Sequence, residues 1–477
     1  MNYFNRNIDC LKKNNKIFYN LLNNRTNKSS NNSIDKITSI DTKENAQSLI
    51  VRKGQKEYRL NSYYYPIKEA NKWAEQFDFK NINTVITMFG LGNGIFAQEI
   101  IKKKEDSDLL IIYEPCIEIF DYVMEHYDLS SVFSGNQVAI IVNGVNDSEF
   151  DHLLSIKVDI TNFFTQIRCM HPKYDEMFEE EYLKYLKRLK DNTFRARLVI
   201  NTELHFGKRF IINELNNLRF LRNSNKLMDL KMEIDSEIPA ILVAAGPSLK
   251  NNISELKRAK GKAYIFVVDR ILDFVLDEGI EPDFIVTVDP IKPLEYFTKR
   301  DDVKIPLLCK LDSNWEVLEQ HKGRKIVYST DLYIAKMYHA MGQTPPLIDT
   351  GTSVATAAFS ACLKLGFKRI ILVGQDLAYD GEATHAGGVA EKIQVGNDIY
   401  VEGIDGKQVR SRYDWYEFLR WFEDKISSNP DADVIDTKDK GAKISGTKIM
   451  PLKEVIDNYC NVSINYSDTY NYTFNDS

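Results

Sequence analysis

One stretch of the sequence, residues 239–289, restricts the possible fold more than any other. It contains three apolar runs, each short enough for a buried strand and each followed at once by small or acidic residues. The residues that follow the runs are Gly246, Pro247 and Ser248, then Asp269, then Asp289. Strands that alternate with helices predict a parallel sheet with helices on both faces. Because ligands bind outside the carboxyl ends of such strands, we expect these residues to line a ligand site.

The length and composition of the chain limit its class. With 477 residues, of which 43% are hydrophobic, we expect roughly two to four domains with sizeable cores. Lysine and arginine number 62 against 68 aspartates and glutamates, so the net charge is -6. This mildly acidic balance argues against a nucleic-acid partner.

Cysteine spacing and hydropathy indicate the compartment. The six cysteines are scattered without the C-x-x-C spacing of a zinc site, which favours free thiols in a reducing environment. No run of about 18 apolar residues occurs, and the N-terminal residues lack the apolar segment of a signal peptide. We therefore expect a protein without a membrane span that works in the cytoplasm.

The order of apolar runs and helical patterns predicts an α/β protein with a central Rossmann-like domain. A smaller Rossmann-like α/β domain and a helical connector should precede it. The expected boundaries are 1–55 for a polar and partly helical N-terminal segment, 56–165 for the smaller domain, 166–236 for the connector, 237–460 for the central domain and 461–477 for a polar tail.

A glycine-rich turn, Gly90-Leu91-Gly92-Asn93-Gly94, follows a predicted strand and opens a predicted helix in the smaller domain. Glu114 ends the next strand. This is the layout of a nucleotide or S-adenosylmethionine site, in which glycines allow close backbone approach and the acid holds a ribose. The strand before the turn lacks the acidic residue usual in methyltransferases, which favours the alternative of a purely structural turn.

A second group of small polar residues, Gly351, Thr352 and Ser353, opens a predicted helix in the central domain. Backbone N–H groups and the helix dipole attract anions at such a position. A capped helix without a ligand is equally compatible with this turn alone. Together with the turn at Gly246, it leaves room for a phosphorylated ligand at one sheet edge.

The loop after the late strand 369–373 carries a candidate general base. His385 follows Gln375, Asp376 and Tyr379 in a polar, glycine-rich loop at the same expected edge. An imidazole there could take a proton from an incoming hydroxyl near neutral pH, although a lone histidine in a loop is also often incidental. The other histidines show no metal-ligand spacing, so we expect no obligatory metal or cofactor.

The combination of these motifs resembles the motility accessory factor (Maf) family of bacterial flagellin glycosyltransferases. The resemblance covers residues 237–450, and the turn at Gly90 followed by Tyr113-Glu114-Pro115 is also typical of the family. It rests on the runs AAGPSLK from Ala244, VTVDP from Val286, GTSVA from Gly351 and VGQDL from Val373. It implies transfer of a nonulosonic acid, pseudaminic or legionaminic, from its CMP-activated form to Ser or Thr of flagellin.

A more distant likeness to single-domain bacterial sialyltransferases implies roles for individual residues. The turn Gly246-Pro247-Ser248 would contact the phosphate or ribose of a CMP-sugar, Asp269 the nucleotide side, and Gln375 and Asp376 the cytidine end. Gly351, Thr352 and Ser353 would hold the phosphate or the sugar carboxylate. The sialyltransferase histidine has no counterpart at 409–413, so the base is either His385 or not a histidine.

The resemblance further implies an inverting displacement at the anomeric carbon, with CMP as the leaving group. His385, Asp289 and Tyr379 are the candidate catalytic residues, and Lys250 and Lys310 are possible helpers. Two alternatives stay open. Archaeal pterin pyrophosphokinases share the Gly-Pro-Ser-Leu turn and would need ATP and Mg²⁺, and a non-catalytic protein that binds flagellin would need neither.

Overall fold

The computed structural model divides the chain into two compact α/β units, Met1–Leu204 and His205–Ser477. This confirms the expected fold class. The boundary between the units lies inside one helix, and it does not coincide with the boundaries expected at 56, 166 and 237. The structure describes residues 3–25, 34–79, 81, 83–221, 227–231, 234–295, 303–330, 332–343, 346–380 and 398–464.

The N-terminal segment is folded into the first unit. Polar composition predicted one helix and little else before residue 56, yet Asn7 is fully buried and its amide donates to the carbonyls of Met124 and Tyr127 at 2.9 and 2.8 Å. The strands form a separate antiparallel sheet in the order β1-β2-β3. The elements are α1 (Phe4–Asn14), α2 (Lys16–Asn24), β1 (Lys36–Asp41), β2 (Gln47–Lys53) and β3 (Lys56–Arg59).

The central sheet of the first unit has four parallel strands in the order β6-β5-β4-β7. Because β5 and β6 follow β4 on one side and β7 lies on the other, the strand order reverses between β4 and β7. The strands are β4 (Val85–Phe89), β5 (Leu109–Glu114), β6 (Val138–Val142) and β7 (Ile167–Met170). The helices are α3 (Pro66–Ala74), α4 (Ile95–Lys103), α5 (Ile117–His126), α6 (Ser130–Phe133), α7 (Asp147–Lys157) and α8 (Tyr174–Met177).

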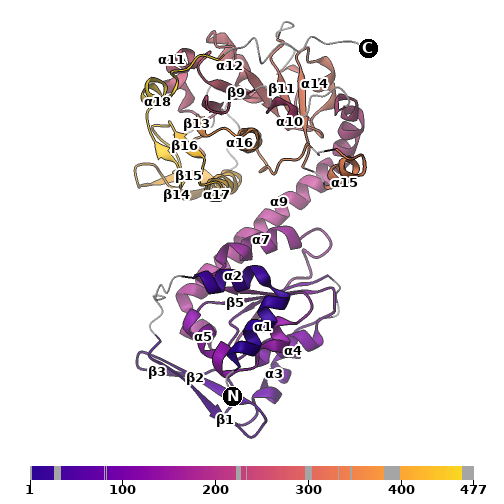
Figure 1. The fold of residues 1–477 in the computed structure, drawn as a ribbon, viewed down its shortest axis with the longest axis vertical. Coiled ribbons are helices and arrows are strands. Elements are labelled where there is room, and N and C mark those ends of the chain that lie inside the picture. The colour runs from indigo at the N-terminus through magenta and orange to yellow at the C-terminus, as the bar shows by residue number, and fades with distance from the viewer. Residues whose placement is uncertain are drawn as a thin grey trace. The chain divides into compact units, whose positions relative to one another are not determined.

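Helix α9 (Glu179–Asn217) contains the boundary between the units and supplies most of the expected helical connector (Figure 1). Its last turns belong to the second unit, where buried asparagine amides donate to backbone carbonyls beyond the strand ends. Asn213 donates to Asp312 and Asn217 to Leu311, both at 2.8 Å. The short elements η1 (Leu218–Leu221) and α10 (Leu227–Leu230) follow.

The second unit is built on eight parallel strands in the order β12-β11-β10-β9-β8-β13-β16-β17. The strands are β8 (Ala240–Val243), β9 (Tyr264–Val268), β10 (Phe284–Thr287), β11 (Leu307–Lys310), β12 (Lys325–Tyr328), β13 (Arg369–Val373), β16 (Asp433–Asp436) and β17 (Lys448–Ile449). The central residues of every strand except the short, exposed edge strand β17 are buried and apolar, as expected when both faces are covered.

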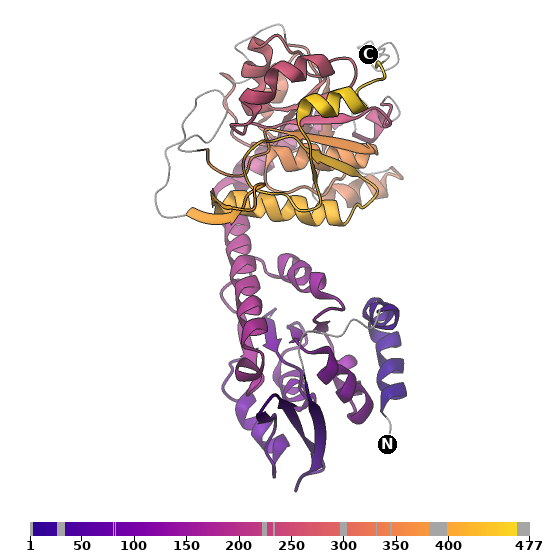
Figure 2. The ribbon, with the colours of Figure 1, turned by 90° about the vertical axis from the view of Figure 1, so that its left-hand side faces the viewer.

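Helices cover both faces of this sheet (Figure 2). Helix α16 packs against β8, β9 and β10, and Phe359 of α16 meets Phe422 of α17 with ring centroids 5.2 Å apart. Helix α11 packs beside α18. The helices are α11 (Leu249–Ala259), α12 (Leu272–Asp277), α14 (Trp315–Gln320), α15 (Leu332–Ala340), α16 (Val354–Leu365), α17 (Tyr413–Ser427) and α18 (Leu452–Tyr459).

An antiparallel hairpin of β14 (Asp398–Glu402) and β15 (Gln408–Arg412) stands outside the large sheet. The sequence did not predict it, because its strands alternate polar and apolar residues only weakly. Among the described residues, no helix is both long enough and apolar enough to span a bilayer.

Candidate functional site

The strand order of the second unit reverses between β8 and β13, which is where ligands bind in open α/β sheets. The turns after these two strands touch directly. The Gly246 N–H donates to the Gly374 carbonyl at 2.8 Å. A side chain at Gly246 would overlap that carbonyl and the Asp376 carboxylate, so only glycine permits this approach.

Ser248 and Asp376 join the two turns. The Ser248 N–H donates to Asp376 Oδ2 at 2.7 Å, and the Ser248 hydroxyl donates to Oδ1. The backbone N–H and the hydroxyl of Ser248 therefore both donate to a carboxylate of the same protein. Burial raises the pKa of Asp376 to about 6, although the Ser248 hydrogen bonds and Lys438 oppose the shift.

Two charged residues that the sequence analysis did not select support the Asp376 turn. The side chains of Asp436 and Lys438 are fully buried and form an ion pair with Nζ 2.5 Å from Oδ2. Lys438 Nζ also donates to the Gln375 carbonyl at 3.1 Å. The one available signal in the sequence was their place at the carboxyl end of an apolar strand, because Asp436 ends β16 and Lys438 follows it.

Gln375 is buried at this junction, and its side-chain oxygen has no hydrogen-bond partner among the described residues. A buried unsatisfied acceptor costs about 1–3 kcal/mol. A bound molecule with an N–H or O–H donor would remove that cost.

A second polar cluster lies beyond β9 and β10. Asp269 is buried, and its two carboxylate oxygens accept from the Thr287 hydroxyl at 2.6 Å and from Lys292 Nζ at 2.8 Å. The structure thus places Asp269 in an internal ion pair. The sequence analysis did not select Lys292, because the residues around a lysine do not show that it pairs with an acid after another strand.

Asp289 lies beyond β10, half-buried, and its carboxylate accepts from the Ile291 N–H at 2.9 Å. Its carbonyl accepts from the Asn314 N–H at 3.1 Å. The Asp289 backbone is thereby fixed, while the carboxylate keeps further acceptor capacity. Its catalytic role stays a prediction.

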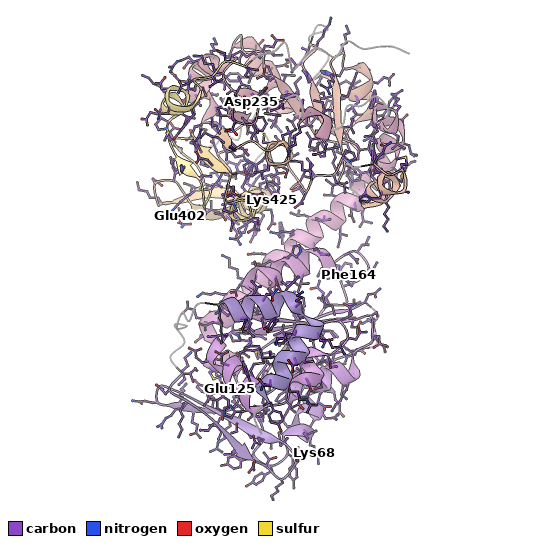
Figure 3. The ribbon with its side chains drawn as sticks, in the orientation of Figure 1. Lys68, Glu125, Phe164, Asp235, Glu402 and Lys425 are labelled. Atoms are coloured by element: carbon purple, nitrogen blue, oxygen red, sulfur yellow. The ribbon has the colours of Figure 1, made fainter. Side chains whose placement is uncertain are left out.

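The turn at Gly351–Ser353 caps helix α16. Ser353 Oγ accepts from the Thr356 N–H at 3.2 Å in a capping box, and Thr352 is exposed. Ahead of the turn, Asp349 pairs with Lys425 of α17, which Figure 3 labels. Because α16 runs into the parallel strand β13, its N-terminus lies on the same edge as the strand ends. Anion binding by this turn stays a prediction.

Tyr379 packs within the second unit. Its ring lies 4.9 Å from the Trp415 ring and 4.8 Å from the guanidinium of Arg410, and its N–H donates to the Arg410 carbonyl at 2.9 Å. These contacts hold the ring against the β14–β15 hairpin. The predicted base, His385, lies outside the described residues.

The glycine turn of the first unit is filled by side chains. A side chain at Gly90 would overlap the Tyr174 ring, and one at Gly92, which has a φ of +55°, would overlap His171. The His171 N–H donates to the Phe89 carbonyl at 2.9 Å, so it follows β7 at the reversal point between β4 and β7. Burial lowers the pKa of His171 to about 4.

Glu114 binds this turn instead of leaving its carboxylate free for a ribose. It accepts from the Leu91 N–H at 2.8 Å, the Cys116 N–H at 3.0 Å and the Tyr174 hydroxyl at 2.9 Å. Burial raises its pKa to about 7 against these hydrogen bonds. The geometry therefore supports the interpretation of the glycine turn as structural.

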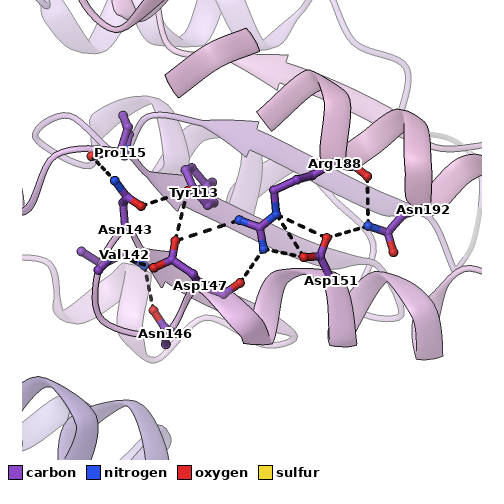
Figure 4. A network of polar contacts seen from close by, with 10 residues as sticks. Tyr113, Pro115, Val142, Asn143, Asn146, Asp147, Asp151, Arg188 and Asn192 are labelled. Carbon is purple, nitrogen blue, oxygen red and sulfur yellow. Dashed lines mark hydrogen bonds and ion pairs between the residues drawn. The ribbon is translucent and has the colours of Figure 1, made fainter. Parts of the chain in front are cut away.

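Beyond β5 and β6 the same edge is occupied by an internal network (Figure 4). Arg188 of α9 donates to Asp151 Oδ2 at 2.8 Å, and its guanidinium lies 4.9 Å from the Phe150 ring. The Tyr113 hydroxyl donates to Asp147 at 3.2 Å. Burial raises the pKa of Tyr113 well above its usual value.

A polar hollow of about 560 Å³ lies elsewhere on the first unit, beside β2 and the start of α9. Four glutamates among its lining residues make it unfavourable for an anionic sugar nucleotide. Its lining residues are Lys53, Tyr58, Glu176, Met177, Glu179, Glu180, Glu181 and Lys184. Across the described part of the chain, no group of three or more His, Cys, Asp or Glu side chains is placed to hold a metal ion.

A family model matches part of the second unit. Residues 212–382 match the family model described as 6-hydroxymethylpterin diphosphokinase MptE-like. A segment of 94 residues is 30% identical to an uncharacterized protein of Treponema pallidum (strain Nichols). That alignment covers 20% of this chain and 43% of the other protein, so the chain spans less than half the length of this curated relative.

A solved structure matches nearly the whole chain. The structure of MAf glycosyltransferase from Magnetospirillum magneticum AMB-1 aligns with a TM-score of 0.58 over 94% of this chain and 74% of that one, at 14% identity. At this identity the match establishes a shared fold. The resemblance that the sequence motifs indicated is thus confirmed as a likeness in fold.

Proposed function

We propose that this chain, which has the fold of a Maf glycosyltransferase, transfers a nonulosonic acid from a CMP-activated donor to Ser or Thr hydroxyls of flagellin. The single observation that supports it most is the match in fold over 94% of the chain. The sugar would be pseudaminic or legionaminic acid, and the transfer would take place in the cytoplasm and serve flagellar assembly and motility.

The donor would lie at the carboxyl ends of β8 and β13. The Gln375 side-chain oxygen, which is buried and accepts from no donor among the described residues, suits an amino group such as that of a cytosine. The N-terminus of α16 at Gly351–Ser353 suits the phosphate or the sugar carboxylate. Ser248 would act through Asp376, since both of its donors are already engaged there.

The reaction would be a direct displacement. The acceptor hydroxyl oxygen forms a bond to the anomeric carbon while the bond from that carbon to the phosphate oxygen breaks. CMP leaves with the bonding electron pair, and the hydroxyl proton passes to a base, for which His385 and Asp289 are the candidates. The protein would mainly position the acceptor and stabilise the departing phosphate.

The match to the MptE-like family model favours one alternative, a pterin diphosphokinase that uses ATP. Its phosphates would need Mg²⁺, whereas a CMP-sugar donor would not. Nucleotide preference therefore separates the two functions. Thermal unfolding should shift upward with CMP and not with ATP and Mg²⁺. Stabilisation by ATP and Mg²⁺ alone would favour the kinase.

Transfer itself can be measured on the purified chain. We expect flagellin incubated with CMP-pseudaminic or CMP-legionaminic acid to gain the mass of the sugar, and CMP to be released in equal amount. Asp289→Ala or His385→Ala should abolish the gain. Asp405→Ala is a matched control, because Asp405 also accepts from an N–H two residues on, at 3.0 Å, but at the exposed tip of the β14–β15 hairpin.

The same two variants test a non-catalytic alternative. If the chain only binds flagellin, Asp289→Ala and His385→Ala will leave flagellin modification in cells unchanged, and the purified chain will release no CMP. Loss of modification in either variant, with the Asp405→Ala control active, supports transfer by this chain.

A further inference from the structure

Lys438 carries a charge that is wholly removed from solvent. Its side chain and that of Asp436 are both 0% exposed, with Nζ 2.5 Å from the Asp436 carboxylate. A buried ion pair adds little net stability compared with apolar residues of similar size. The position of this pair, at the carboxyl end of β16, therefore calls for an explanation other than stability.

The pair holds the turn that carries Asp376. Lys438 Nζ donates to the Gln375 carbonyl at 3.1 Å. On the other side, the Ala442 N–H donates to the Asp376 carbonyl at 2.8 Å, and Gly441 packs so closely there that a Cβ would lie 2.6 Å from the same oxygen. The Asp376 turn is thus held by hydrogen bonds from residues 438 and 442. In addition, Ser248 donates to the Asp376 carboxylate.

We propose that Lys438 is a positioning residue for the donor site: with Asp436 as its counter-ion, it fixes the Gly374–Asp376 turn so that Asp376 holds the Ser248 turn in the geometry that binds the donor. This inference rests on the proposed function. Lys438 does not contact the reacting atoms; it acts through the Gln375 carbonyl and the Asp376 carboxylate.

The charges around Asp376 give this role a measurable consequence. Only the ionised carboxylate accepts both Ser248 hydrogen bonds. Lys438 lowers the pKa of Asp376 and Asp436 raises it. The other charged groups on this segment point to other partners: Asp439 accepts from Asn251, and Lys440 pairs with Asp380 at 3.6 Å near solvent. Lys438 and Asp436 should therefore act on Asp376 in opposite directions.

The experiment measures CMP affinity of the full chain by calorimetry from pH 5 to pH 8. In the parent, affinity should fall as the pH drops through about 6. In Lys438→Met the midpoint of this fall in CMP affinity should move to higher pH by about half a unit or more. In Asp436→Asn the midpoint should move to lower pH. At pH 5, which lies below both midpoints, we expect Lys438→Met to bind CMP about 3-fold or more weakly than the parent.

Lys440→Met is the control, because it removes an exposed lysine of the same segment. The midpoint of its CMP affinity against pH should match that of the parent. If Lys438→Met does not fold, Asp436→Asn, which keeps the lysine, carries the test alone. Unchanged midpoints, or shifts of both variants in one direction, overturn the positioning role and leave the proposed function intact. A parent that binds no CMP at any pH overturns both.

Discussion

Ser248 donates both its hydroxyl and its backbone N–H to the carboxylate of Asp376, which lies 128 residues later in the chain. This pair closes the junction between β8 and β13, where the strand order reverses. The helix α11 N-terminus thereby receives its negative partner from within the protein. If a donor phosphate binds at this junction, we expect it to use other N–H groups, such as those at the N-terminus of α16.

Asp376→Asn should flatten the dependence of stability on pH. The folded-state pKa is raised to about 6, so the stability that Asp376 contributes is complete below its unfolded pKa and is lost as pH rises through about 6. Between pH 4 and pH 8 the parent should lose about 2–3 kcal/mol relative to the variant. Thermal unfolding at both pH values measures this, and Asp405→Asn, an exposed carboxyl, should retain the parent's pH dependence.

Asp269→Asn should destabilise the second unit strongly, because it removes the negative charge of a buried ion pair in which Lys292 Nζ lies 2.8 Å from the Asp269 carboxylate. Breaking a buried ion pair costs about 3–5 kcal/mol. Glu237→Gln breaks the exposed pair with Lys368 and should cost less than about 1 kcal/mol. Denaturant unfolding compares the two, and equal costs would contradict the importance assigned to the buried pair.

The double variant Asp269→Asn/Lys292→Met separates charge from function. Removing both charges should recover most of the lost stability. If CMP affinity recovers as well, Asp269 has only a structural role. If affinity stays low in a stable protein, Asp269 contributes to the donor site as the sialyltransferase likeness implied.

Gly92→Ala should cost more than Gly144→Ala. Both glycines have positive φ, +55° and +77°, so alanine pays about 1–2 kcal/mol of backbone strain at either. At Gly92 the new methyl would also overlap His171, whereas at Gly144 no described atom beyond the two neighbouring residues would lie within 4 Å of it. Chemical denaturation measures the difference, and the added variant His171→Ala should reduce the cost at Gly92 alone.

Tyr174→Phe should destabilise the first unit by about 1–3 kcal/mol, because the Gly92 N–H loses its acceptor and Glu114 loses a donor. The lost hydrogen bond had lowered the pKa of Glu114, so that pKa, about 7 in the parent, should rise further. Unfolding midpoints at pH 6 and pH 8 test both effects. Tyr63→Phe, at an exposed hydroxyl, should change neither.

Local patterns predicted most of the framework. The apolar runs at 240–245 and 369–373 contain the buried strands β8 and β13, and Gly366 ends α16 in the left-handed conformation. Periodicity and turn chemistry act over a few residues, so they can be recognised without knowing what packs nearby. The N-terminal segment was underestimated for the same reason: its stability comes from contacts such as that of Asn7 with residues more than 100 positions away.

The sequence by itself determined that small and acidic residues end the strands, and parallel strands put such ends on one edge. Only the tertiary structure decided which ends meet. The placement of β8 beside β13 joins Ser248 to Asp376 and brings in Lys438, and the placement of β4 beside β7 fills the Gly90 turn with His171 and Tyr174. These pairings depend on strand order across more than 60 residues, which no local pattern encodes.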